Sequence, residues 1–288
     1  MKRSFYLILA AISILSATPC SAQRAAAPNR EGLCDTDYDY PLYGNVSSIK
    51  VSTYKLVDKF GAETKGDFLG SHVIHFNSKG DVTSAHVYLG EGVTEICTYA
   101  YDSQGRITSI NSKDADSGSY EGKTVMKYGS NGKMSQCSRY MANGSLYSRD
   151  MYTYDSNNRI IREQSYSGDG TFLLKTSYSY GSNGKVSKEI CYDDSNNISY
   201  KKVFVYDSYK NLVKFTSYEQ NGSIMYEETY KYDGKGYLTL STERERFDIN
   251  KVTYKYRYDS RGNVIEKRSY IGDALIPDRI EVYTISYR

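Results

Sequence analysis

The sequence has no tryptophan, only four prolines, three histidines and five cysteines among its 288 residues. Beyond the N-terminal segment it has no apolar run approaching the ~20 residues that a membrane-spanning helix needs. It also lacks a nucleophile elbow, a phosphate-binding glycine loop and a Cys-x-x-Cys motif. The common signatures of acyl hydrolases, nucleotide-binding enzymes and thiol-redox proteins are therefore absent.

Residues that could hold a metal are equally scarce. His72 and His75 are three residues apart, which places them on opposite faces of a strand, so they cannot hold one ion together. The recurrent aspartates, such as Asp155 and Asp259, follow tyrosines at positions where a carboxylate caps a turn. No two carboxylates stand out as a glycosidase pair. We expect no catalytic residue, no metal and no cofactor.

The first 22 residues resemble a secretory signal peptide. Lys2 and Arg3 precede about a dozen mostly apolar residues, and the small residues ending at Ala22 complete the pattern. A lipid anchor at Cys20 is the alternative, although the three residues before this cysteine lack the usual leucine and small residue. We expect export to the periplasm, the outer cell surface or the medium, without a membrane span.

Removing Lys2 and Arg3 lowers the formal charge from +3 to +1, and the sequence shows no basic patch that would indicate a nucleic-acid partner. Four cysteines remain after cleavage. In a meander with two strands per repeat, Cys137 and Cys191 would lie ~19 Å apart. A disulfide requires Cα atoms within ~7 Å, so no disulfide framework is expected.

Residues 23–42 show no periodicity and are predicted to be a flexible linker. The run from Asp35 to Tyr40, DTDYDY, is acidic and aromatic, and a docking tail is the alternative to a solvated linker.

Tyrosine is abundant, with 32 copies, and it marks an internal repeat. An anchor tyrosine followed by Asp or Gly recurs at 26-residue intervals, apart from the first interval, which is 27. The anchors are Tyr101, Tyr128, Tyr154, Tyr180, Tyr206, Tyr232 and Tyr258.

The residues after each anchor predict a type I turn closed by a glycine bulge. In Asp155-Ser156-Asn157-Asn158, the aspartate caps the turn and the fourth residue adopts a left-handed conformation. Glycine or asparagine occupies this fourth position in most copies. Lys210 is the exception, and we expect a strain of about 1 kcal/mol there.

The turn sets the register, so each anchor should face an aliphatic residue across the hairpin. The expected pairs are Tyr101–Ile107, Tyr128–Met134, Tyr154–Ile160, Tyr180–Val186, Tyr206–Leu212, Tyr232–Leu238 and Tyr258–Val264. Strict alternation then predicts one aromatic face that also carries Tyr99, Met126, Tyr152, Tyr178, Phe204, Tyr230, Tyr256, Tyr140, Tyr166, Tyr192, Tyr218 and Tyr270. The opposite face is predicted to be polar, with Thr153, Glu163, Ser187, Glu189, Lys231, Arg257 and Lys267.

A second hairpin signal, such as Asn143-Gly144 or Asp169-Gly170, completes each repeat as strand, turn, strand, turn. Residues 43–288 then form one β-repeat domain of about nine repeats and eighteen strands. The predicted fold is all-β, an antiparallel meander of 26-residue two-strand repeats forming a curled or spiral single sheet with its tyrosine face inside.

The segments from Tyr99 to Ile107 and from Tyr256 to Val264 follow the pattern Tyr-x-Tyr-Asp-x-x-Gly-(Arg/Asn)-(Ile/Val). This pattern resembles the YD repeats of Rhs and teneurin proteins. In that family the repeats wind into a β-spiral shell around a toxin or form a cell-surface recognition module. The period here is 26 rather than roughly 21, and the autoproteolytic core and toxin domain are missing. The chain resembles a short, free-standing secreted bacterial member of that family.

These observations favour a non-catalytic exported repeat scaffold that binds a glycan or a protein partner at the bacterial envelope. The candidate ligand-binding residues are Tyr152, Tyr178, Tyr230 and Tyr256, because tyrosine combines an apolar ring with a hydrogen-bonding rim. The alternatives are a carrier or accessory component of an Rhs-like toxin or secretion system and, third, a hydrolase.

Overall fold

The computed structural model describes residues 41–59, 62–89, 93–245 and 248–288. The predicted signal peptide, Cys20, Cys34 and nearly all of the predicted linker lie outside these residues. Within them no helix is long and apolar enough to cross a membrane.

Eighteen strands make up the described chain, the number that the sequence predicts. Their bounds are β1 Val46–Lys59, β2 Ala62–Phe76, β3 Val82–Leu89, β4 Val93–Tyr101, β5 Ile107–Asp114, β6 Tyr120–Tyr128, β7 Met134–Met141, β8 Leu146–Tyr154, β9 Ile160–Ser167, β10 Phe172–Tyr180, β11 Val186–Tyr192, β12 Ile198–Tyr206, β13 Leu212–Glu219, β14 Ile224–Tyr232, β15 Leu238–Glu245, β16 Asp248–Tyr258, β17 Val264–Ile271 and β18 Arg279–Tyr287.

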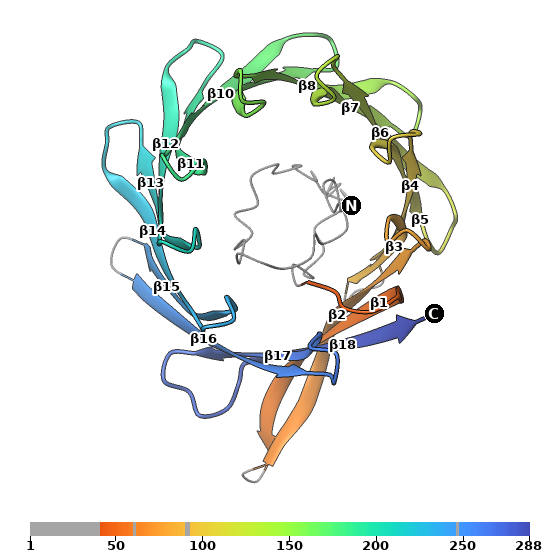
Figure 1. Ribbon diagram of the computed structural model, residues 1–288, viewed down its shortest axis with the longest axis vertical. Helices are drawn as coiled ribbons and strands as arrows, with labels where there is room; N and C mark the ends of the chain where they lie inside the picture. Colours follow the sequence, from red (N-terminus) through yellow and green to blue (C-terminus); the bar gives the residue numbers. More distant parts are fainter. Residues whose placement is uncertain (1–40, 60–61, 90–92, 246–247) are drawn as a thin grey trace, which may run out of the picture.

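The sheet closes into a barrel. Each strand pairs antiparallel with the next in sequence, and β1 also pairs antiparallel with β18, from Val46–Tyr287 to Lys55–Arg279. Figure 1 shows the resulting ring with the first and last strands side by side. The prediction of a curled or spiral single sheet is therefore wrong. Closure satisfies the backbone groups of both edge strands, which an open sheet would leave exposed.

The seam between the chain ends has the densest apolar packing. Ile49 and Val51 of β1 and Ile74 of β2 are almost completely buried, and Tyr283 of β18 joins their cluster. At the turn end of the seam, the fully buried Asn263 accepts a hydrogen bond from the Tyr43 amide and donates to the Tyr43 carbonyl. Side chains from both ends of the chain thus fix the closure.

The predicted turns are confirmed. The Asp155 amide donates to the carbonyl of Arg159, and the Asn158 amide donates to the carbonyl of Asp155. Asn158 and Lys210 have φ values of 60° and 67°, in the left-handed region. All seven predicted anchor–aliphatic pairs are also confirmed, as in Tyr154–Ile160.

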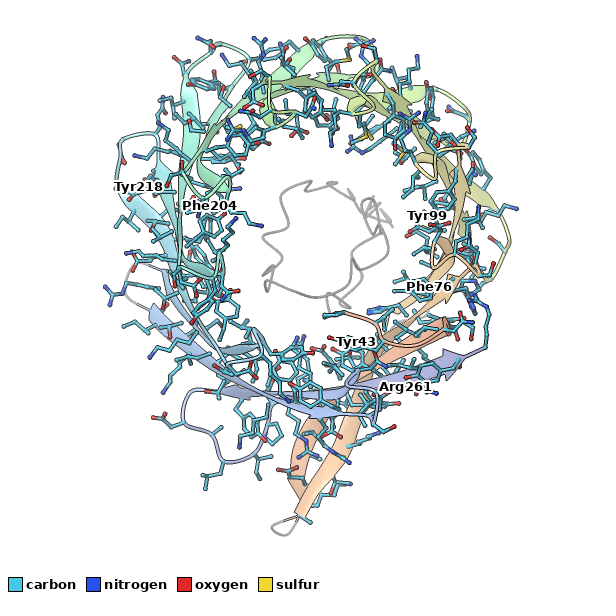
Figure 2. All side chains as sticks on the ribbon, in the orientation of Figure 1. Tyr43, Phe76, Tyr99, Phe204, Tyr218 and Arg261 are labelled. Atoms are coloured by element: carbon cyan, nitrogen blue, oxygen red, sulfur yellow. The ribbon has the colours of Figure 1, made fainter. Side chains whose placement is uncertain are left out.

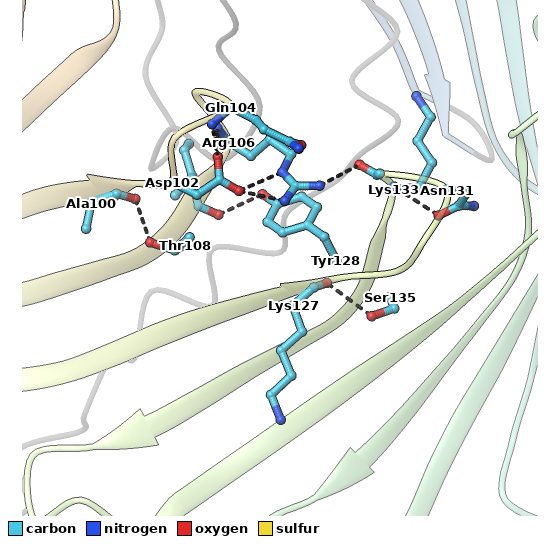
Figure 3. A network of polar contacts seen from close by, with 12 residues as sticks. Ala100, Asp102, Gln104, Arg106, Thr108, Lys127, Tyr128, Asn131, Lys133 and Ser135 are labelled. Carbon is cyan, nitrogen blue, oxygen red and sulfur yellow. Dashed lines mark hydrogen bonds and ion pairs between the residues drawn. The ribbon is translucent and has the colours of Figure 1, made fainter.

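Beyond each aliphatic residue the strand contains a β-bulge. In β9, Ile160 pairs with Tyr154 but Arg162 pairs with Thr153, so Ile161 is an additional residue. In several hairpins a Ser or Thr hydroxyl at this position donates to a carbonyl of the neighbouring strand, as Thr108 does to Ala100 at 3.2 Å (Figure 3). A bulge of one residue reverses the faces of everything that follows.

The assignment of some tyrosines to the predicted aromatic face is consequently wrong. Tyr166 lies opposite Arg149 on the outer wall, and Tyr218 lies opposite Lys201. Figure 2 places Tyr218 outside the ring and Phe204 on its inner side. Tyr140, Tyr166, Tyr192, Tyr218 and Tyr270 all point outward. In exchange, Glu163, Glu189 and Lys267 of the predicted polar face point inward, opposite Tyr152, Tyr178 and Tyr256.

Candidate functional site: the lumen wall

The lumen is large because of the number of strands. Eighteen strands spaced about 4.8 Å apart and tilted by about 40° give a backbone diameter of about 35 Å. The inward-facing side chains of the described strands cannot fill a barrel of this strand number. The described inward-facing side chains form a wall around this interior (Figure 2).

Near the aspartate turns, the wall consists of the anchor tyrosines and their aliphatic partners. Five of the seven anchor phenols reach back across one hairpin and donate to the backbone carbonyl of an aliphatic residue. These bonds are 2.6–2.7 Å long and join Tyr101 to Val82, Tyr128 to Ile107, Tyr154 to Met134, Tyr180 to Ile160 and Tyr232 to Leu212. The ladder ties neighbouring repeats together.

The turns add charged contacts between neighbouring repeats. Asp102 accepts from the Gln104 and Arg106 amides, and the Arg106 guanidinium bonds to the same carboxylate (Figure 3). These hydrogen bonds, with the Arg106 amide foremost, lower the pKa of Asp102. Arg106 also lies over the Tyr128 ring of the next repeat, 4.3 Å from its centroid. The anchors and the repeated aspartates therefore have structural roles.

Further along the strands the wall becomes polar. We call this zone the polar belt, and its charged members are Arg139, Asp150, Glu163, Glu189, Lys202, Glu228, Glu243, Lys267 and Glu281. Three ion pairs cross it: Arg139–Asp150 at 2.6 Å, Lys202–Glu189 at 3.2 Å and Lys267–Glu281 at 3.0 Å. Its six acidic and three basic residues leave an excess of carboxylates facing the lumen.

The excess is concentrated on β14 and β15. Glu228 lies directly opposite Glu243 in the strand pairing. Glu228 accepts hydrogen bonds from the phenols of Tyr226 at 2.8 Å and Tyr230 at 2.9 Å. Among the described residues, no basic side chain pairs with either carboxylate. Two facing carboxylates without a counter-charge favour a ligand that supplies hydroxyl or ammonium donors.

Burial raises the pKa of one carboxyl and of two phenols in this belt. Burial, with the charge of Asp150 next, raises the pKa of Glu163, which accepts a hydrogen bond from Tyr178 at 3.0 Å. Burial and nearby carboxylates likewise raise the pKa values of Tyr178 and Tyr230. Both phenols therefore remain protonated and can donate.

The four candidate ligand-binding tyrosines all face the lumen, but they differ in burial and in hydrogen-bond partners. Tyr152 is only 8% exposed, and its hydroxyl has no hydrogen-bond partner within the described chain. Tyr178 and Tyr230 are half-buried and bond to Glu163 and Glu228. Tyr256 donates to the Leu238 carbonyl at 2.9 Å, as the anchor tyrosines do. Tyr178 and Tyr230 are thus the two joined to carboxylates of the belt.

Sequence reasoning missed Glu163 and Glu189 because it placed them on the opposite, polar face. A signal was present: a hydroxyl residue follows the aliphatic residue in Ile107-Thr108, Met134-Ser135 and Val186-Ser187. These hydroxyls bond across the bulge at 3.2–3.3 Å.

The remaining candidate sites hold little chemistry. In the described ranges, no group of three or more His, Cys, Asp or Glu side chains is arranged to hold a metal ion. His72 pairs with Val51 on the lumen side, whereas His75 lies on the outer wall with its ring centroid 5.5 Å from that of His86. Cys97, Cys137 and Cys191 are buried thiols on three separate strands.

Comparisons with known proteins leave the family open. No protein-family model matches the chain, and no curated protein matches it, so membership of the YD-repeat family is not confirmed. A porin-like protein from Bacteroides uniformis is similar in structure, with 13% identity, a TM-score of 0.46, and coverage of 85% of this chain and 99% of that one. A porin-like protein from Bacteroides vulgatus gives 12% identity and a TM-score of 0.39, over 84% and 98% of the two chains.

Part of a Tc toxin is also similar in structure. The Photorhabdus luminescens Tc holotoxin pore matches with 13% identity and a TM-score of 0.35, covering 77% of this chain. The match spans only 15% of that toxin chain.

Proposed function

We propose that this chain is an exported, non-catalytic scaffold of the bacterial envelope that binds a glycan in the lumen of its barrel. The observation that carries the proposal is the arrangement on β14 and β15, where Glu228, Glu243 and two phenols face a wide interior. Carboxylates accept hydrogen bonds from sugar hydroxyls, and tyrosine offers a ring face with a polar rim. The absence of a basic partner for the two glutamates among the described residues favours neutral or amino sugars over acidic ones.

A glycan array with the full mature chain tests this proposal. Tyr230→Ala and Glu243→Gln should each weaken binding to neutral or amino glycans by about tenfold, which corresponds to ~1.4 kcal/mol. Tyr218→Ala is the matched control, since it removes the same side chain from the outer wall of the neighbouring strand. Equal losses in the lumen and outer-wall variants, with both proteins folded, would contradict a lumen site.

The second candidate is a carrier for a polypeptide segment, as in a toxin-associated role. The excess of carboxylates in the polar belt supports a basic segment as cargo. A basic peptide that competes with array glycans and loses affinity in Glu243→Gln would favour this candidate. Toxin genes beside the coding gene would favour it too, whereas glycan-uptake genes would favour the first.

A further inference from the structure

The outer wall carries a repeated pair of side chains that the lumen site does not use. On β6 to β13, four successive hairpins each place a basic residue directly opposite a tyrosine. The pairs are Lys123–Tyr140, Arg149–Tyr166, Lys175–Tyr192 and Lys201–Tyr218. We call these four pairs the outer belt.

Three of the pairs make cation–π contacts. The Lys175 ammonium lies 4.2 Å from the centroid of Tyr192, and the Lys201 ammonium lies 4.1 Å from that of Tyr218. The Arg149 guanidinium is 5.3 Å from the centroid of Tyr166. These contacts hold each cation over one face of a ring and leave the phenol rim beside it.

The cations of the outer belt are not neutralised. Within the described chain, none of the four forms an ion pair with a carboxylate, and the Lys175 ammonium bonds instead to the Asn196 side-chain oxygen at 2.6 Å. Arg162 and Lys188 add two exposed cations to the outer wall of the same strands. The net charge of the sequence is near neutral, yet the outer wall on β6 to β13 is basic and the polar belt has an excess of carboxylates.

The spacing of the pairs indicates a polymer. Successive pairs are two strands apart, about 9.6 Å across the strands, and each is shifted by two residues along them, so neighbouring pairs lie ~12 Å apart and the outermost two ~35 Å apart. The distance between neighbouring pairs is comparable to the length of two linked pyranose rings. A nucleic-acid strand would need open ring faces for its bases to stack, but in three pairs a cation already covers one face.

We propose that the outer belt docks a linear anionic polysaccharide, with one acidic disaccharide against each cation–tyrosine pair. The carboxylate of each disaccharide contacts the cation, and the sugar hydroxyls meet the phenol rim. The belt lies on the opposite face of the sheet from the lumen, so this surface is independent of the lumen glycan site.

Calorimetric titration of the full mature chain with alginate, a linear polyuronate, tests the proposal. We expect saturable binding that weakens as salt rises, because the contacts are ionic and exposed. Replacing all four cations (K123Q/R149Q/K175Q/K201Q) should weaken binding by about tenfold or more. The matched control, K50Q/K55Q/K79Q/K133Q, removes the same charge from exposed lysines outside the outer belt and should retain most of the affinity.

A second variant separates the aromatic contribution from charge and keeps all four cations. Y192L/Y218L should weaken alginate binding several-fold while leaving the salt dependence unchanged. Three outcomes would overturn the proposal: no alginate binding, equal losses in the outer-belt and control variants, or tighter binding of single-stranded poly-dT or of anionic phospholipid vesicles to the same belt. Loss of neutral-glycan binding in Glu243→Gln with alginate binding intact would show that the two sites are separate.

Discussion

Tyrosine performs different tasks at different positions of the repeat. The anchors pack against aliphatic residues and donate to backbone carbonyls, as Tyr154 does to Met134 at 2.7 Å. Tyrosines two residues earlier, such as Tyr178, join the polar belt instead. Those near the far end of the second strand, such as Tyr218, face outward beneath a cation. A single residue type therefore serves structure, the lumen surface and the outer surface.

Glu163 gives a pH prediction at the residue scale. Its raised pKa means that burial favours the protonated form in the folded state. Its contribution to stability is complete below the ordinary glutamate pKa and is lost as pH rises through the raised value. Glu163→Gln should therefore raise the urea midpoint at pH 7 and change it little at pH 3. The exposed Glu121→Gln is the control. A larger gain at pH 3 than at pH 7 would contradict this account.

At the scale of the hairpin, the sequence predicted most of the fold. The turn type, the seven anchor pairs and the number of strands all follow from local patterns, namely Asp at the first turn position and Gly or Asn at the fourth. The prediction failed after the bulge, since one additional residue such as Ile161 reverses every later face. Five tyrosines of the predicted aromatic face and three charged residues of the predicted polar face were thereby assigned to the wrong wall, whereas the four candidate tyrosines were not.

Lys210 occupies the left-handed position that glycine holds elsewhere, with φ of 67°. Lys210→Gly should raise the free energy of unfolding by about 0.5–1 kcal/mol, since glycine relieves the strain but gains entropy in the unfolded chain. Gly184→Ala is the reciprocal test, because no other atom lies within 4 Å of an added Cβ and its φ is 79°. It should lower stability by about 1 kcal/mol, as urea titration would measure. A loss in both variants would exclude backbone strain as the cause.

At the scale of the whole molecule, closure could not be read from the repeat. A repeat fixes how each strand meets its neighbour, whereas closure depends on the two ends, where β1 and β18 depart from the pattern. Tyr43, Asn263 and Ile49 are unremarkable in sequence, yet they hold the seam. The lumen and the polar belt exist only because the seam forms, whereas the sequence predicted no more than a curled sheet with its tyrosine face inside.

Deleting strands tests the β1–β18 closure, because a fully antiparallel barrel requires an even number of strands. Removing residues 181–206 deletes β11 and β12 and joins Tyr180 to the aspartate turn that normally follows Tyr206. Sixteen strands can still close with β1 antiparallel to β18, and barrels of that number are known. Removing residues 193–206 deletes β12 alone and leaves seventeen, which would force β1 and β18 into a parallel pair. Circular dichroism and size-exclusion chromatography should show a folded, less stable monomer for the first deletion and unfolded or aggregated protein for the second, smaller one. Equal folding of both deletions would mean that the β1–β18 pairing does not hold the barrel together in solution.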